Sequence, residues 1–116
     1  MHADNQIPMP AIFRRVMEVS ATKAGTIRIV LADDHAVVRR GLQLLLEAEE
    51  CLEVVASVGD VEAAIRTTRG HKPDVLVLDL NVPGGSSLDA IPTILEASLG
   101  TRIVVLTMQN LSLIHI

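Results

Sequence analysis

Four side chains that carry oxygen atoms stand at the ends of apolar runs in this sequence: Asp33, Asp34, Asp79 and Thr107. Runs rich in Val, Leu and Ile are typical of buried parallel strands, and ligands bind at the carboxyl ends of such strands. We therefore expect these four side chains, although far apart in the sequence, to converge on one edge of a sheet.

Three carboxylates held close together repel one another, and each raises the pKa of its neighbours unless a cation joins them. A hard ion with oxygen ligands meets this need, and Mg²⁺ suits a site of one or two carboxylates, a carbonyl and waters. Because the donors are oxygens, zinc and copper are not expected. A carboxylate beside Mg²⁺ could attack phosphorus and form an aspartyl phosphate, which water would later hydrolyse. The alternative is that Asp33 and Asp34 only cap a helix and that Asp79 is a turn residue.

The elements that must position these residues alternate between strand and helix. Apolar runs predict four strands, at Ile27–Ala32, Leu52–Val58, Asp74–Asp79 and Arg102–Thr107. Between them, apolar residues recur at helical spacing from Val37, from Val61 and from Leu88. Because Pro92 has no N–H, the first turn of the last helix is expected near Asp89. This alternation predicts a doubly wound α/β sheet with right-handed crossovers.

Composition excludes several classes of function. The chain has 116 residues, of which 49% are hydrophobic and 21% charged, which fits one globular domain. Phe13 is the only aromatic residue, so a platform that stacks nucleic-acid bases is not expected. A net charge of -4 argues against direct binding of DNA by this segment. The single cysteine, the lack of a secretory signal and the lack of a membrane-length apolar run favour a cytoplasmic protein.

Three segments resemble the receiver domain of two-component response regulators of the LuxR/NarL type. They are IRIVLADDHAVVRRGL (Ile27–Leu42), PDVLVLDLNVPG (Pro73–Gly84) and RIVVLTM (Arg102–Met108). The resemblance covers Ile27 to about Asn110, and the acid pair, the aspartate and the hydroxyl occur in the family's order. It implies a flavodoxin-like (CheY-like) doubly wound parallel sheet.

The resemblance also implies a role for each site residue. Asp79 would accept a phosphoryl group from the phosphohistidine of a histidine kinase, and Thr107 would be the switch hydroxyl that moves toward the phosphate. Asp34 would bind Mg²⁺ directly and Asp33 through water, while Asn81 would offer its backbone carbonyl. His35 receives no catalytic role and is expected to be a surface or cap histidine.

The sequence departs from the family pattern at its C-terminal end. Receivers have a fifth strand ending in a Lys that contacts the phosphoryl group, whereas Lys23 and Lys72 are the only lysines here. We therefore interpret 27–110 as a receiver truncated before the fifth strand, 111–116 as a tail foreign to the family, with an artefactual origin as a hypothesis, and 1–26 as a flexible leader. The last predicted strand would then be an exposed apolar edge, and the chain would fold poorly alone.

Two further departures concern the loop after Asp79. Val82 stands where Met is frequent, which is a mild change. Ser87 stands where Gly is usual, and a positive φ at that position would strain the backbone.

Two other functions stay open at this stage. A pseudo-receiver would use the same surface to bind partners without being phosphorylated. An enzyme on a flavodoxin-like sheet is less favoured, because the sequence lacks GxGxxG and P-loop patterns. Arg14-Arg15 and Arg39-Arg40 are interpreted as solvated basic pairs rather than a DNA footprint. Transcriptional control by a longer parent, which could form a homodimer, is implied by the family alone.

Overall fold

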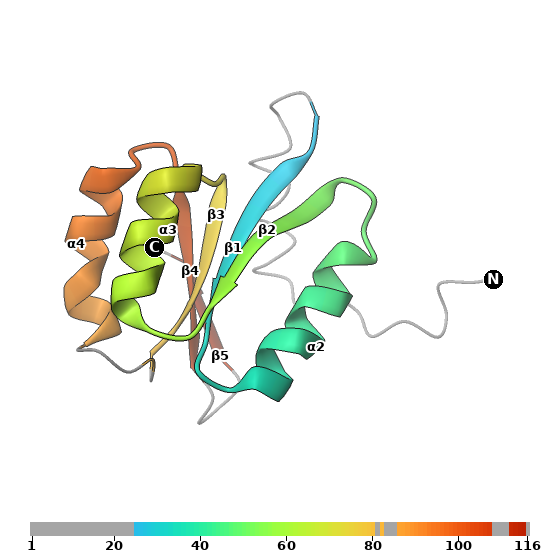
Figure 1. The fold of residues 1–116 in the computed structure, drawn as a ribbon, viewed down its shortest axis with the longest axis horizontal. Coiled ribbons are helices and arrows are strands. Elements are labelled where there is room, and N and C mark those ends of the chain that lie inside the picture. The colour runs from blue at the N-terminus through green and yellow to red at the C-terminus, as the bar shows by residue number, and fades with distance from the viewer. Residues whose placement is uncertain (1–24, 81, 83–85, 108–111, 116) are drawn as a thin grey trace.

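A single five-stranded sheet forms the centre of the computed structural model, which describes residues 25–80, 82, 86–107 and 112–115 (Figure 1). The strands are β1 (Ile27–Ala32), β2 (Leu52–Val58), β3 (Val75–Asp79), β4 (Arg102–Thr107) and β5 (Ser112–His115). Their order across the sheet is β2-β1-β3-β4-β5. The first four strands pair in parallel, as their apolar runs predicted.

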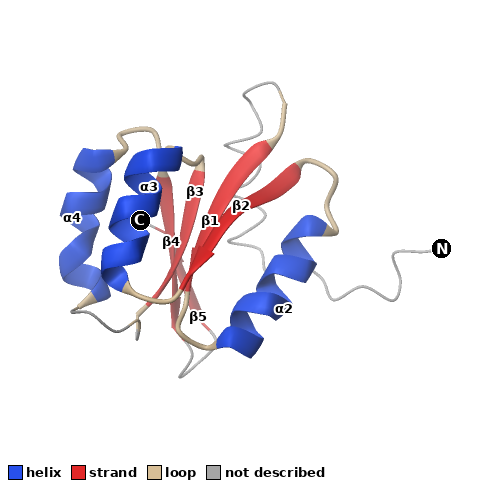
Figure 2. Ribbon diagram, in the orientation of Figure 1, coloured by secondary structure: helices blue, strands red, loops and turns tan. Residues whose placement is uncertain are grey.

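Within the described residues, three helices cover the two faces of the sheet. They are α2 (Ala36–Glu47), α3 (Val61–His71) and α4 (Ser87–Ala97). In Figure 2, α2 lies on one face of the sheet, while α3 and α4 lie side by side on the other. This arrangement confirms the predicted doubly wound α/β fold.

Alternate residues of each strand supply two separate layers of core, one on each face of the sheet. On β1, Ile29 and Leu31 face the layer under α2, which contains Leu46. Val30 and Ala32 face the layer under α3 and α4. Because successive strand side chains point to opposite faces, a central strand covered on both sides must be apolar at every position. The central strands β1 and β3 are therefore buried along almost their whole length. This burial determines where the polar residues at the carboxyl ends of the two strands lie.

Helix α4 begins two residues earlier than Pro92 suggested. The helix starts at Ser87, and the side chain of Ser86 caps it by accepting a hydrogen bond from the Asp89 N–H at 3.4 Å. Pro92 lies inside the helix, where its missing N–H removes one backbone hydrogen bond. The serine cap and the burial of Ile91 and Ile94 determine the start of the helix in spite of that loss.

The expectation that β4 would be an exposed edge was wrong. β5 pairs with β4 in an antiparallel register from Thr107–Ser112 to Val104–His115. Only four residues separate the two strands in the sequence, whereas a parallel pairing requires a crossover of a dozen residues or more. The short connection therefore dictates antiparallel pairing, and β5 covers the backbone groups that β4 would otherwise present.

Two of the proposed segment boundaries fall largely on residues outside the described part of the chain. The predicted leader 1–26 is described only at residues 25 and 26, and the tail 111–116 only at 112–115. Their interpretation as leader and foreign tail stays a prediction. Among the described residues, none of the helices has the length and apolar character needed to cross a membrane.

The two-layer core predicts that alanine substitution will have very different effects on stability at two aliphatic residues near the end of α4. Ile94 is fully buried in the layer under α3 and α4, so Ile94→Ala should lower the free energy of unfolding by about 2–5 kcal/mol. Leu99 is 88% exposed, so Leu99→Ala should change it by less than about 0.5 kcal/mol. Urea denaturation followed by circular dichroism measures both, and equal losses would contradict the assigned packing.

Candidate functional site

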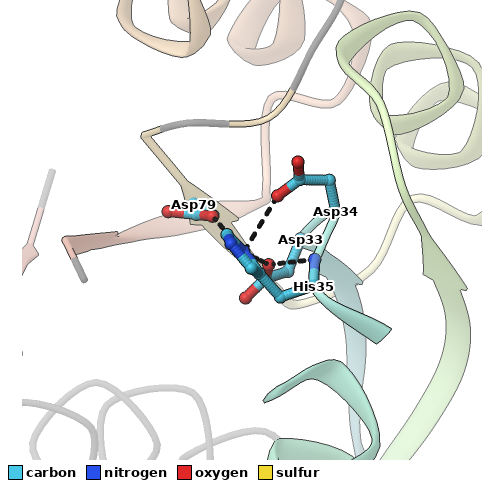
Figure 3. A group of neighbouring side chains, drawn as sticks. All are labelled: Asp33, Asp34, His35 and Asp79. Atoms are coloured by element: carbon cyan, nitrogen blue, oxygen red, sulfur yellow. Dashed lines mark hydrogen bonds and ion pairs between the residues drawn. The ribbon is translucent and has the colours of Figure 1, made fainter. Parts of the chain in front are cut away.

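Three aspartates meet at the carboxyl end of the sheet. Asp33 and Asp34 directly follow β1, and Asp79 is the last residue of β3, the strand paired with β1. One ligand atom from each of these carboxylates, together with one from His35, lies within 4.8 Å of the others (Figure 3). The structure thus brings together three of the predicted residues, separated by up to 46 positions in the sequence (79 - 33 = 46).

The three carboxylates differ in their exposure to solvent. The side chains of Asp33 and Asp79 are 3% and 0% exposed, whereas that of Asp34 is 36% exposed. Asp79 is buried because it still belongs to the central strand, and Asp34 is more exposed because it lies in the loop between β1 and α2. The acidic cluster therefore has a buried floor, formed by Asp33 and Asp79, and one partly exposed carboxylate at its rim, that of Asp34.

His35 is the residue whose place the sequence interpretation missed. Its Nδ1 lies 2.9 Å from Asp34 Oδ1, 3.1 Å from Asp33 Oδ1 and 3.8 Å from Asp79 Oδ2 (Figure 3). The side chain is about half exposed and the residue is the N-cap of α2, as predicted for a surface or cap histidine. However, its side chain makes no capping hydrogen bond and lies against the acidic cluster instead. Its position directly after two aspartates was the available signal.

The environment of His35 raises its pKa above the usual 6.5. The largest cause is the hydrogen bond to Asp33, followed by the charge of Asp34. Partial loss of hydration opposes these effects, and the charge of Asp79 adds a smaller contribution. A protonated His35 therefore supplies positive charge to the three carboxylates.

Arg39 also serves the acid pair. It projects from α2, and its guanidinium donates a hydrogen bond of 2.6 Å to the backbone carbonyl of Asp33. The Asp33 N–H donates to the carbonyl of Val58 at 3.0 Å. These contacts hold the backbone of Asp33 from both sides. Of the basic pair interpreted as a solvated face, Arg40 is exposed, whereas Arg39 is half-buried and makes this structural contact.

The arrangement does not support the alternative in which the acid pair only caps a helix. α2 has His35 at its N-cap, and no residue of its first turn is acidic. Asp33 Oδ1 accepts from the backbone N–H of His35 at 2.8 Å, which fixes the loop before the helix. Its other oxygen, Oδ2, is buried and has no hydrogen-bond donor among the described residues.

These residues fit a hard divalent cation. Three carboxylates offer oxygen ligands of the kind that Mg²⁺ prefers. A buried carboxylate oxygen without a donor is costly unless a cation or water contacts it, and Asp33 Oδ2 is such an atom. The acidic cluster can therefore hold a divalent metal ion, with Asp33, Asp34 and Asp79 as candidate ligands.

Asn81 and Thr107 are the two remaining predicted site residues. Asn81 lies outside the described residues, so its carbonyl ligand stays a prediction. Thr107 is the last residue of β4, one position beyond Leu106, which is the register partner of Asp79. The backbone of Thr107 thus ends at the same edge of the sheet as the acidic cluster.

The expected strain at Ser87 is absent. Ser87 is the first residue of α4, and Lys72 is the only non-glycine residue with positive φ in the described ranges. Its hydroxyl donates a hydrogen bond of 2.7 Å to the backbone carbonyl of Asp79. A serine is therefore accommodated here by an ordinary helical backbone.

The position of His35 predicts a pH dependence in the metal-free protein. Because its folded-state pKa is raised, the stabilisation from protonated His35 should be complete below pH 6.5 and disappear as the pH rises through the folded-state value. An NMR titration of the ring should give a pKa above 6.5, and Asp34→Asn should lower it. A wild-type pKa at or below 6.5 would contradict the contacts described.

Comparison with known proteins agrees with this geometry. Residues 29–113 match the model of the response regulator receiver domain family. The oxygen regulatory protein NreC of Staphylococcus haemolyticus is 47% identical over 84 residues, covering 72% of this chain and 39% of that protein. The chain thus spans about two fifths of the length of this curated relative.

Solved structures give the same result. A LuxR-family two-component response regulator from Aurantimonas sp. superposes with a TM-score of 0.67 at 38% identity, covering 72% of this chain and 60% of that one. RcsB from Salmonella enterica serovar Typhimurium, bound to promoter rprA in the presence of the phosphomimetic BeF3-, has a TM-score of 0.67 at 32% identity, covering 72% and 43%. With its doubly wound sheet and acidic cluster, this chain belongs to the receiver domain family of two-component response regulators, in the LuxR/NarL group.

Proposed function

We propose that this receiver accepts a phosphoryl group on Asp79. The observation that supports this most directly is the position of the Asp79 carboxylate, which is buried at the end of a central strand and clustered with two further aspartates. An oxygen of Asp79 would attack the phosphorus of a phosphohistidine, the P–N bond would break and the imidazole would leave. Water would later attack the aspartyl phosphate, releasing phosphate and the free carboxylate.

The cluster gives each aspartate a separate part in this reaction. Asp34, at the rim of the site, would bind Mg²⁺ directly, and Asp33 would act through water, with the Asn81 carbonyl as a further ligand. When bound, Mg²⁺ neutralises charge on the oxygens of the transferring phosphoryl group. The contacts of the Asp33 backbone with Arg39 and Val58 would hold the loop that carries Asp34 in place. The buried floor would keep Asp79 in one orientation for in-line attack.

Thr107 would convert phosphorylation into a change of shape. Its hydroxyl would move toward the phosphoryl oxygens, which bind one conformer better than the other and so shift the population. The position of its backbone at the end of β4, one residue beyond the register partner of Asp79, supports this role.

A sensor histidine kinase is the proposed phosphodonor, and control of transcription is the proposed output of the full-length regulator. The relatives named above include an oxygen regulatory protein and a regulator bound to a promoter, and both are longer than the matched region. DNA contact and homodimer formation are assigned to the full-length protein rather than to this segment. A cytoplasmic location belongs to the same proposal.

The proposal makes the chain a stoichiometric phosphoacceptor rather than a multiple-turnover enzyme. The nucleophile and the acceptor are the same side chain, so each cycle must end with hydrolysis of the aspartyl phosphate at Asp79 before another begins. A pseudo-receiver, which binds partners without phosphorylation, is the outcome if no phosphoryl group is gained.

Phosphorylation is tested with a small phosphodonor and Mg²⁺. The wild-type chain should gain one acid-labile phosphoryl group, measured by intact-protein mass spectrometry, and Asp79→Asn should gain none because the attacking oxygen is removed. Asp89→Asn is the matched control, since Asp89 is an exposed aspartate in the first turn of α4. It should be labelled like the wild type. Labelling that persists in Asp79→Asn would place the nucleophile elsewhere.

Metal binding is tested without phosphorylation. Titration of the metal-free protein with Mg²⁺, followed by the backbone amide resonances of Asp34 and His35, should give a saturable shift. Asp34→Asn should weaken the affinity by about tenfold or more, because loss of even an outer-shell partner commonly costs about 10–100-fold. Glu96→Gln, on the exposed surface of α4, removes the same charge away from the site and should leave the affinity unchanged. Equal affinity in all three proteins would remove Asp34 from the ligand set.

A further inference from the structure

The hydroxyl of Ser87 links helix α4 to the phosphoacceptor strand. Ser87 is 1% exposed, and its Oγ donates to the backbone carbonyl of Asp79 at 2.7 Å. The contact joins the first residue of α4 to the last residue of β3, across eight positions of the sequence. It is a side-chain bond to the main chain of the proposed nucleophile itself.

The Asp79 carbonyl lies where regular strand pairing has ended on one side. The register between β1 and β3 stops at Ala32–Leu78, one residue before Asp79. Asp79 is fully buried, and a buried carbonyl that lacks a donor is destabilising. The hydroxyl of Ser87 thus supplies a donor at a point that β1 no longer reaches.

The same peptide group is also held at its other end. The N–H of Leu80, which belongs to the peptide that begins with the Asp79 carbonyl, donates to the Leu106 carbonyl of β4 at 3.1 Å. One hydrogen bond from α4 and one to β4 therefore fix the plane of the Asp79–Leu80 peptide. Because the peptide group is planar, fixing both ends limits rotation of the backbone at Asp79 and with it the direction of the Asp79 side chain.

Two neighbouring serines at the start of α4 make different hydrogen bonds. Ser86 is exposed and caps α4 by accepting from the Asp89 N–H, whereas Ser87 is buried and donates to the strand. The receiver pattern has Gly at the position of Ser87, and Gly carries no hydroxyl. This chain therefore has a link between α4 and the nucleophile that a Gly could not form.

We propose that Ser87 is a positioning residue for the phosphoacceptor, which holds the Asp79–Leu80 peptide so that the Asp79 carboxylate stays aligned within the acidic cluster. This inference rests on the proposed phosphorylation of Asp79. It assigns Ser87 no contact with the phosphoryl group, since its hydroxyl is engaged by the backbone carbonyl.

The first test compares rates of phosphorylation by a small phosphodonor at saturating Mg²⁺. Ser87→Ala and Ser87→Gly should each react about tenfold more slowly than the wild type, which is less than the ~100-fold that a 1 Å displacement can cause. Ser86→Ala is the matched control, because it removes a hydroxyl from the adjacent residue and weakens the helix cap without touching Asp79. It should react at the wild-type rate at a temperature where circular dichroism shows all four proteins folded.

The second test does not depend on phosphorylation. The carbonyl ¹³C resonance of Asp79 and the amide resonance of Leu80 report directly on this peptide, and both should shift in Ser87→Ala but not in Ser86→Ala. Unchanged resonances in Ser87→Ala, or equal slowing by Ser86→Ala and Ser87→Ala, would overturn the positioning role. A wild-type chain that gains no phosphoryl group would instead overturn the proposed function, and the resonances would still decide whether Ser87 holds the peptide.

Discussion

Electrostatic repulsion between Asp33, Asp34 and Asp79 is the constraint around which this molecule is organised. Carboxylates this close destabilise one another, and two of them are removed from water by the sheet on which they stand. The fold tolerates this because β1 and β3 are buried and paired side by side, so the aspartates at their ends have no freedom to move apart. The function of the domain depends on the same enforced proximity.

The basic side chains of His35, Arg39 and Lys72 contact different parts of the structure. His35 contacts the carboxylates from the solvent side and carries positive charge when it is protonated, while Arg39 binds the backbone carbonyl of Asp33. Lys72, the only lysine among the described residues, donates to the Ala97 carbonyl at 3.3 Å and precedes β3, at the far end from Asp79. Among the described residues, the titratable imidazole of His35 is thus the one side chain that forms ion pairs with the carboxylates, which leaves them suited to a divalent cation.

Hydrogen bonds to the main chain hold the strand ends that carry the aspartates. Arg39 holds the backbone at Asp33, and Ser87 together with Leu106 holds the peptide that follows Asp79. Arg39 and Ser87 are helix side chains, and each contacts the end of a strand that carries an acid. The helices on both faces of the sheet therefore pack the core and also fix the backbone from which the aspartates project.

Sequence alone determined the alternation of strands and helices and the convergence of the three aspartates, because continuous apolar runs and the shared carboxyl edge of a parallel sheet leave few other arrangements. The acid pair, Asp79 and the residues around them also indicated the family from the sequence alone. Tertiary structure decided what local patterns could not: the His35 ring in the cluster, Arg39 on the Asp33 carbonyl, the Ser87 bond to Asp79 and the antiparallel β5. The last three depend on contacts between elements, and the approach of His35 to Asp79 depends on the pairing of β1 with β3, whereas periodicity and propensity describe only one element at a time. The start of α4 shows the same limit, since the cap at Ser86 and the burial of Ile94 outweighed the signal of Pro92.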